Sequence, residues 1–263
     1  MADPTTLRDL ALEVTRAVAP KLRQLAGRTP AEDTKSSATD LVTAADRWSE
    51  SQIVSRLLDA RPEDGILAEE ETSLEGTSGV RWIIDPIDAT TNFVYGLAGY
   101  SISIGAEIDG EPAVGVIVDP TNGDEFAAAL GAGATCNGDP IRVSGQVDLS
   151  QALVATGFGY QPDRRRNQAI GLVEVLPRIR DIRRGGGAAM DLANVAAGRL
   201  DAYYERGLEP WDIAAGTVLV SEAGGAIGDL DGNPTDGDFV LAAPPGLRDA
   251  LAELLRSVEA DRA

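Results

Sequence analysis

Apolar side chains recur every three to four residues from Leu7 to Leu25, and this period predicts an amphipathic helix at the start of the chain. A polar loop at Lys35-Ser36-Ser37 follows it. A second helix is expected to begin near Thr43, with apolar contacts supplied by residues 48–58. Two short β-like runs come next, at residues 66–68 and 81–84, and acidic residues follow each of them.

The pattern becomes sheet-like from residue 100 to residue 130. Residues 101–108, 113–119 and 124–130 are predicted to form successive antiparallel strands, with turns at Asp109-Gly110 and Thr121-Asn122-Gly123. Beyond Gly145 helical and strand patterns alternate. Helices are predicted at residues 165–176, 188–197, 211–223 and 246–258, and strands at 152–155, 201–204 and 239–242. We therefore predict an α/β fold of two halves, residues 1–145 and 146–263, which share one interface.

The amino-acid composition excludes several kinds of catalytic and metal-binding site. The 263 residues are 43% hydrophobic, which is enough for a sizeable core. Cys136 is the only cysteine, so an intramolecular disulfide and a thiolate metal cage are excluded. There is no histidine, which excludes a Ser-His-Asp triad and imidazole zinc sites. Any hydrolysis must therefore use carboxylates, hydroxyls and hard cations.

The chain carries a formal net charge of -19, from 42 acidic and 23 basic residues. Such a charge disfavours nucleic acid and anionic membranes as partners. No run of 18 apolar residues predicts a membrane span, and the first nine residues lack a secretory pattern. A cytoplasmic protein is expected. The acidity is consistent with a solubility surface or with adaptation to high salt, and composition does not distinguish them.

Three acidic groups follow predicted strands or open predicted helices: Glu69-Glu70-Glu71, Asp85 with Asp88, and Asp212. Ligand sites of α/β proteins favour such positions, and carboxylate oxygens suit Mg²⁺. Each group alone is more often a solvated face, a turn or a helix N-terminus. The hypothesis of a metal site depends on the three groups occurring together.

The segment Asp85-Pro86-Ile87-Asp88 is expected to form a loop in which proline fixes φ and both carboxylates face a pair of cations. Two metals about 3.5–4 Å apart can clamp the attacking and leaving oxygens of a phosphoryl displacement. Thr90-Thr91 would supply hydroxyls and, at a helix start, N–H donors for a phosphate. No Lys or Arg occurs between Asp85 and Gly96, so phosphate binding there requires metal ions.

Longer motifs carry a resemblance to a known family. They are Asp40-Leu41-Val42-Thr43-Ala44-Ala45-Asp46, Ala68-Glu69-Glu70, the run from Trp82 to Val94, Asp201-Ala202-Tyr203-Tyr204-Glu205, Trp211-Asp212-Ile213-Ala214-Ala215-Gly216 and Glu222-Ala223-Gly224-Gly225. In this order and spacing they resemble the inositol monophosphatase family, from about Lys35 to Ala243. The last motif is interpreted as a helix end that closes in glycine.

The resemblance implies a layered α/β/α/β/α sugar-phosphatase fold, usually a homodimer, with two or three Mg²⁺ ions and frequent inhibition by lithium. It implies that Glu69, Asp85 and the Ile87 carbonyl hold one metal, and that Asp85, Asp88 and Asp212 hold a second. Glu69 and Thr90 would orient the attacking water, Asp46 would bond Thr90, and Glu70 would support the site or hold a third metal. The implied substrate-binding residues are Asp88, Ala89, Thr90, Gly186, Gly187, Ala188, Glu205 and Asp212, with Glu205 directed at polyol hydroxyls.

This chain departs from the family pattern at three positions. The family usually has glycine in place of Ala68 and Ala89, and Ser or Thr in place of Gly187. If φ at residue 89 is positive, alanine costs roughly 1 kcal/mol or more and can misdirect a phosphate-binding N–H. If φ is negative, alanine is harmless. Arg183 and Arg184, beside the glycine run, either attract anionic substrates or belong to the surface.

Hydrolysis of myo-inositol 1-phosphate or a similar polyol monophosphate is the leading functional hypothesis. Fructose 1,6-bisphosphate, histidinol phosphate and a nucleotide 3′-phosphate are alternative substrates within the family, although the match at Tyr204-Glu205 disfavours histidinol phosphate. A different class of function is an inactive relative that serves as an interaction protein. The intact set of acidic residues argues against that class.

Overall fold

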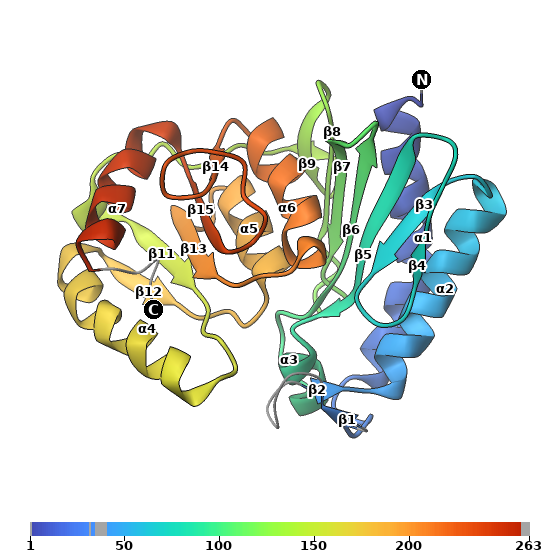
Figure 1. Cartoon of the computed structure of the whole chain (residues 1–263), viewed down its shortest axis with the longest axis horizontal. Coiled ribbons are helices and arrows are strands. Elements are labelled where there is room, and N and C mark those ends of the chain that lie inside the picture. The colour runs from blue at the N-terminus through green and yellow to red at the C-terminus, as the bar shows by residue number, and fades with distance from the viewer. Residues whose placement is uncertain (1, 32, 35–40, 259–263) are drawn as a thin grey trace.

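The computed structural model describes residues 2–31, 33–34 and 41–258. The polar loop at Lys35-Ser36-Ser37, and Asp40 of the first motif, lie outside the described residues. Figure 1 shows five layers, with helices outside and between two sheets. The layers are α1 (Pro4–Leu25) and α2 (Ala44–Ala60), an eight-stranded sheet, α5 (Ala188–Ala196) and α6 (Pro210–Glu222), a five-stranded sheet, and α4 (Pro162–Val175) with α7 (Pro245–Ser257). The α/β/α/β/α architecture is therefore confirmed.

The two N-terminal helices begin at side-chain caps. Asp3 accepts from the N–H groups of Thr5 and Thr6 at the start of α1. Thr43 caps α2 together with Asp46, three residues into the helix, in a capping box. Such caps stabilise a helix by about 1 kcal/mol each because they satisfy N–H groups that have no acceptor within the helix. Both helices begin and end within a few residues of the predicted bounds.

The eight-stranded sheet has the strand order β10-β9-β8-β7-β6-β5-β3-β4 and is antiparallel except for β3 and β5. The three strands predicted after residue 100 are confirmed, and the turns between them contain Asp109 (φ 53°) and Gly123 (φ 84°). Strands β4, β9 and β10 were not predicted, because runs of two to four residues show little periodicity. The strands are β3 (Gly65–Ala68), β4 (Ser73–Leu74), β5 (Val80–Asp88), β6 (Ser101–Ile108), β7 (Glu111–Val118), β8 (Glu125–Ala129), β9 (Gly133–Cys136) and β10 (Asp139–Pro140).

Strand β5 corrects one expectation. Asp85-Pro86-Ile87-Asp88 is not a loop after the strand but its last four residues. Asp85 pairs with Ser103 and Asp88 with Ser101 of β6, and the register shifts between them. Pro86 has no N–H to give to the ladder, which accounts for an irregularity here. In a regular strand, residues three apart point to opposite faces, so the shift is what allows both carboxylates to face one cavity.

The five-stranded sheet has the order β12-β11-β13-β15-β14. Strand β11 (Leu153–Thr156) is parallel to β12 (Asp181–Arg183) and to β13 (Ala202–Arg206), whereas β15 (Phe239–Ala243) is antiparallel to β13 and to β14 (Ala226–Gly228). Strands β12 and β14, of three residues each, were missed by the sequence pattern. The remaining elements are β1 (Asp33–Thr34), β2 (Leu41–Val42), α3 (Thr90–Tyr95) and the 3₁₀ turns η1 (Leu149–Gln151) and η2 (Leu176–Arg178).

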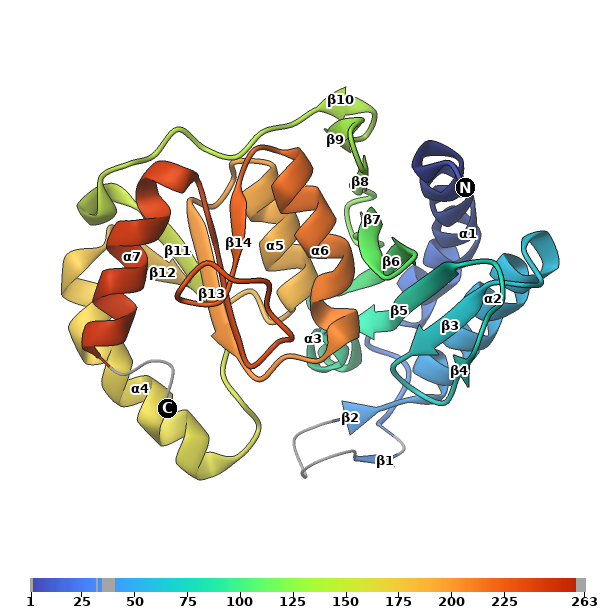
Figure 2. The same cartoon turned by 45° about the horizontal axis from the view of Figure 1, so that its top comes forward.

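Helix α6 lies directly on strands β6 and β7, as Figure 2 shows. Glycines make this close approach possible. A Cβ at Gly115 would meet the Ala215 carbonyl oxygen, and one at Gly105 would lie 2.7 Å from Ala214 Cβ. The two large sheets come from chain segments on either side of residue 145, yet α6 of the second segment packs on the first sheet. The division at residue 145 therefore stays a prediction.

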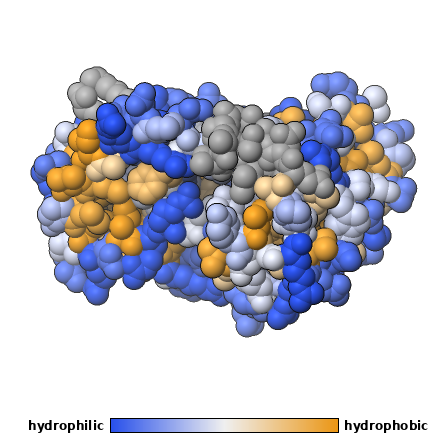
Figure 3. Space-filling view, turned by 90° about the horizontal axis from the view of Figure 1, so that it is seen from below, coloured by the Kyte–Doolittle hydropathy of each residue, from blue (hydrophilic) through white to orange (hydrophobic). Residues whose placement is uncertain are grey.

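Helix α4 packs on the outer face of the second sheet through a narrow face of the helix. Val175 is its buried residue, while Ile170 and Val173 are 63% and 65% exposed on the opposite side. Figure 3 shows apolar side chains gathered on the left of the face seen from below, where α4 lies in Figure 1. None of the described helices is long and apolar enough to span a membrane.

Candidate active site

A cavity of about 570 Å³ opens where the two sheets meet the start of α6. Its wall combines β5 and α3 with segments from the second half of the chain. The predicted site residues that line it are Glu69, Asp85, Ile87, Asp88, Ala89, Thr90, Gly186, Gly187, Ala188, Glu205 and Asp212. The folding of the chain thus brings together segments that are far apart in the sequence.

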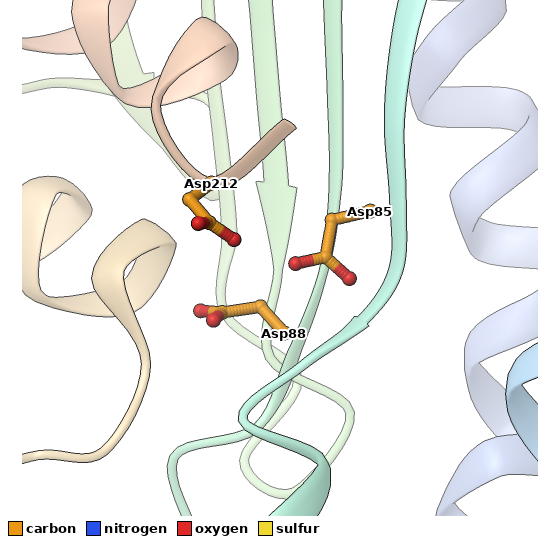
Figure 4. A group of neighbouring side chains, drawn as sticks. All are labelled: Asp85, Asp88 and Asp212. Carbon is orange, nitrogen blue, oxygen red and sulfur yellow. The ribbon is translucent and has the colours of Figure 1, made fainter. Parts of the chain in front are cut away.

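Three carboxylates form the centre of this site. One oxygen each from Asp85, Asp88 and Asp212 lies within 4.8 Å of the other two. Figure 4 shows the side chains converging, two from β5 and one from the start of α6. Only hard oxygen donors meet at this point, and Mg²⁺ accepts such a set while keeping several waters. The residues present therefore fit a magnesium site.

Each of these carboxylates is oriented by a backbone N–H. Asp85 Oδ1 accepts from the Ile87 N–H at 3.0 Å. Asp88 Oδ2 accepts from the Ala189 N–H at the start of α5, at 3.1 Å. Asp212 Oδ2 accepts from the Glu209 N–H at 2.7 Å, in a capping box that begins α6 with Pro210. Asp212 therefore both caps a helix and faces the cavity, so the two interpretations of it from the sequence are compatible.

Burial and mutual repulsion disfavour the ionised forms of these groups. Burial, followed by the charges of neighbouring carboxylates such as Glu69, raises the pKa of Asp85 well above its usual value. Burial likewise raises the pKa of Asp212 well above its usual value, and that of Asp88 to about 7. A bound divalent cation would reverse this preference, because it stabilises the charged carboxylates.

Thr90 connects the cavity to helix α2. Its hydroxyl lies 3.2 Å from Asp46 Oδ1 and 3.1 Å from the Ile87 carbonyl oxygen, so it can donate to either. Asp46 is fully buried, and its other oxygen, Oδ2, accepts from the Thr43 N–H at 2.8 Å. The helix cap thus fixes the carboxylate that faces Thr90. Asp46 itself stands behind the cavity wall rather than in it.

Comparison with known proteins shows which family has this sequence and fold. The sequence profile of the inositol monophosphatase family matches residues 3–260. The chain belongs to the inositol monophosphatase family. It is 43% identical over 234 residues to the inositol-1-monophosphatase SuhB of Mycobacterium tuberculosis, covering 84% of this chain and 80% of that protein. It is 39% identical over 237 residues to the Nus factor SuhB of Escherichia coli, covering 86% and 89%.

Solved structures agree with this assignment. The inositol monophosphatase of Thermotoga maritima superposes with a TM-score of 0.89 at 32% identity, covering 96% of this chain and 98% of that one. The extragenic suppressor protein SuhB of Bartonella henselae superposes with a TM-score of 0.90 at 35% identity, covering 95% and 98%. The chain is therefore a phosphatase with the fold of its family.

On the wall formed by β13, Glu205 is held by Tyr203. The Tyr203 hydroxyl donates to Glu205 Oε2 at 2.7 Å, and a Cβ at Gly157 would collide with the same carboxylate. Asp191, on α5, also lines the cavity but was not singled out in the sequence. Burial and the charge of Glu205 raise the pKa of Asp191 to about 8. Its position within a helical pattern gave no sign of this role.

Ala89 has a left-handed backbone, with φ 66° and ψ 51°. Of the two alternatives considered for this residue, the one with positive φ and a strained alanine is therefore the correct one. Alanine in this region costs about 1–2 kcal/mol relative to the right-handed conformation. Its methyl group also occupies space beside Gly187. A Cβ at Gly187 would lie 3.0 Å from Ala89 Cβ and would meet Asp88 Oδ2. A side chain at residue 187 would therefore press on both the Ala89 methyl group and the Asp88 carboxylate, and glycine avoids both.

Because the Ala89 methyl group lies beside Gly187, we expect the effects of substitutions at these two positions on activity to depend on each other. Gly187→Ser alone should lower kcat/KM about tenfold or more, because the new side chain displaces Asp88. Adding Ala89→Gly should recover part of the loss, since one of the two obstructing groups is removed. The test is kcat/KM for the wild type, both single variants and the double variant. Strictly additive effects would show that the two positions do not interact.

Glu50 was missed by sequence reasoning because it lies within the helical pattern of α2. It is 3% exposed and accepts hydrogen bonds from three consecutive N–H groups, those of Glu70, Glu71 and Thr72, at 2.8–3.0 Å. The Thr72 hydroxyl adds a fourth at 2.7 Å. One buried carboxylate therefore fixes the loop that follows Glu69. Glu70 takes part through its backbone and is not among the described residues that line the cavity.

We expect Glu50→Ala to raise the Mg²⁺ concentration needed for half-maximal activity by about tenfold, because Glu69 would lose its supporting loop. The free energy of unfolding should fall by roughly 2–3 kcal/mol, since three N–H groups lose their acceptor. Magnesium titrations of activity and thermal melts measure the two effects. A lower stability with an unchanged magnesium requirement would limit Glu50 to a structural role.

Proposed function

We propose that this phosphatase hydrolyses myo-inositol 1-phosphate or a similar polyol monophosphate with a water activated by Mg²⁺. The observation that carries the proposal is the convergence of Asp85, Asp88 and Asp212 on one point of a cavity that also contains Glu205. The carboxylates suit magnesium, which would in turn bind the phosphate, while Glu205 is an acceptor for substrate hydroxyls. Proteins similar to this chain bear the name inositol-1-monophosphatase.

In this proposal Asp85 and Asp88 contribute ligands from β5, Asp212 from α6, and Glu69 and the Ile87 carbonyl complete the set. Bound magnesium would lower the pKa of water and neutralise charge on the phosphoryl group. The number of ions, two or three, rests on the family resemblance, and Glu70, which is not among the described residues that line the cavity, would act as a support through its loop.

The protein groups around the metals position water and phosphate. The Thr90 hydroxyl can donate to Asp46, which leaves its oxygen free to accept a hydrogen bond from the attacking water and so to orient it. Glu69 would accept from the same water. The N–H groups of Ala89 and Thr90 open helix α3, where the first N–H groups of a helix lack acceptors within the helix, and they would hold the phosphate.

The alcohol part of the substrate would lie against Gly186, Gly187 and Ala188 and bind Glu205. Burial raises the pKa of Glu205, whereas the hydrogen bond from Tyr203 and the charges of Arg184 and Arg164 lower it. The effect of burial is the largest, so the pKa of Glu205 stays above its usual value. A carboxylate held by one tyrosine can accept from neighbouring hydroxyls of a polyol.

Phosphate release in the presence of Mg²⁺ tests the proposal. The panel contains myo-inositol 1-phosphate, fructose 1,6-bisphosphate, histidinol phosphate and a nucleotide 3′-phosphate. Turnover of myo-inositol 1-phosphate that disappears with EDTA and returns with Mg²⁺ is the expected result. No turnover of any inositol phosphate would reject the substrate class, and no turnover at all would favour the inactive interaction protein.

A further inference from the structure

The cavity that holds the carboxylate cluster also contains arginines. Arg164, Arg184 and Arg206 line it together with the acidic groups. Arg206 has a partner, because its guanidinium lies 3.5 Å from Asp238 Oδ1. Within the described part of the chain, the guanidinium groups of Arg164 and Arg184 make no hydrogen bond and no ion pair within 4.0 Å. Two charged groups at the cavity wall therefore keep their donors available.

Arg164 is seated in a slot made by glycine. It belongs to the first turn of α4, and its Cδ lies 2.5 Å from where a Cβ at Gly159 would stand. Its Cζ lies 2.6 Å from the corresponding position at Gly207, which has φ 71°. A side chain at either glycine would displace the arginine. The local backbone therefore accommodates this guanidinium beside β13 and Glu205.

Arg184 follows β12 and is placed by contacts from the other half of the chain. Asn92 of α3, which is 8% exposed, donates to the carbonyl oxygen of Gly185 at 2.9 Å. Arg184 Nη1 lies 2.9 Å from where a Cβ at Gly186 would stand. The neighbouring Arg183 instead donates to Asp181 Oδ2 at 2.7 Å. The two arginines treated alike in the sequence therefore have different surroundings.

Neutralisation of Glu205 does not account for this arrangement. Both arginines are near enough to act on the pKa of Glu205, and the charge of Arg184 also acts on that of Asp191, yet neither arginine forms a hydrogen bond or an ion pair with either carboxylate. The Glu205 carboxylate is bonded by the Tyr203 hydroxyl. An arginine that serves a carboxylate normally forms a forked pair with it, and the same fork matches the oxygens of a phosphate. The open donors therefore point to an anion that enters the cavity.

We propose that Arg164 and Arg184 form a second anion subsite, so that the cavity prefers phosphorylated polyols that carry a second phosphate. The proposal rests on the phosphatase function above and deepens it. The carboxylate cluster would process one phosphomonoester, with water taken up and inorganic phosphate released. The second phosphate would stay attached to the polyol and bind the two arginines. A cavity of about 570 Å³ lies within the range that holds ligands of this size.

The test compares D-glucitol 6-phosphate with D-glucitol 1,6-bisphosphate, two acyclic polyols that differ by one phosphate. With the full chain and Mg²⁺, kcat/KM should be about tenfold or more higher for the bisphosphate, as expected for charge-assisted contacts. Arg164→Gln and Arg184→Gln should each lower this ratio severalfold. Arg166→Gln and Arg183→Gln are matched controls on the neighbouring positions, and they should keep the wild-type ratio.

The outcomes separate this proposal from the phosphatase proposal. If the wild type hydrolyses neither glucitol ester nor myo-inositol 1-phosphate, the phosphatase proposal fails. If it hydrolyses the monophosphates but has a ratio near one, only the second subsite is refuted. An unchanged ratio in both Arg164→Gln and Arg184→Gln also refutes it. Thermal melts show whether each variant is folded, and Arg184→Lys, which keeps the charge but loses the fork, should retain part of the preference.

Discussion

Asp88→Asn is expected to lower kcat/KM by about 10³-fold or more, because the variant removes a charge from the centre of the proposed magnesium site. The fold should persist. An asparagine oxygen can still accept from the Ala189 N–H, which the carboxylate now does at 3.1 Å. Without metal the variant should be at least as stable as the wild type, since a buried group whose pKa is raised to about 7 has been replaced by a neutral one. Steady-state kinetics and thermal melts in EDTA measure both effects.

Asp119→Asn provides a matched control. Asp119 is also buried, and it accepts from the Thr121 N–H at 2.7 Å outside the cavity. This variant should keep its magnesium dependence and most of its activity, and any loss should appear in the melting temperature. Activity near the wild-type level in Asp88→Asn would refute the assignment of Asp88 to the metal site.

The metal-free protein is expected to lose stability as the pH rises from 5.5 to 8. In the folded chain, burial raises the pKa values of Asp85, Asp88 and Asp212 above the usual 3.8. The folded state therefore holds more protons than the unfolded state between pH 3.8 and at least about 7. The three carboxyl groups therefore add their full contribution to the free energy of unfolding below pH 3.8. That contribution is lost as the pH rises through their folded pKa values. The expected fall in melting temperature is about 5 °C.

Magnesium should reverse most of that loss at pH 8, because a cation that binds only the folded state stabilises it. Melts with EDTA, and with Mg²⁺ at matched ionic strength, separate this binding from screening by salt. Asp88→Asn should show a shallower pH dependence, since one of the three groups is neutral at every pH. A melting temperature that is flat across this range in EDTA would contradict the account of the cluster.

The sequence predicted most of the long elements and the acidic centre of the cavity, but not lining residues such as Asp191 and Arg164. Long helices such as α1 and α7 have a clear apolar period, and the motif around Asp85 is specific enough to indicate a family. The same information could not show that β5 continues through Asp88. Proline is usually excluded from the middle of a strand, so a loop was the better local prediction. The pairing of Asp88 with Ser101 extends strand β5 to residue 88, and this pairing with the next strand, β6, leaves no mark in the local pattern around Pro86.

Other parts of the site depend on contacts that no local pattern records. Glu50 lies in a helix with other polar residues, and only the fold brings its carboxylate to the N–H groups of Glu70 to Thr72. Arg183 and Arg184 are adjacent in the sequence, yet one forms a surface pair with Asp181 and the other lines the cavity. For Ala89 the sequence defined two alternatives, and the backbone angle was needed to choose between them.

Because the site contains residues from both halves of the chain, it can form only late in protein synthesis. Asp88 leaves the ribosome well before Asp212, and at about 5–20 residues per second the interval is roughly 6–25 s. Throughout that interval the first sheet lacks helix α6, which covers strands β6 and β7 in the finished protein. A nascent chain therefore lacks one carboxylate of the cluster. Under the proposed function, the cation can bind only when the surface that α6 covers is closed, so hydrolysis would be confined to chains whose two halves have come together.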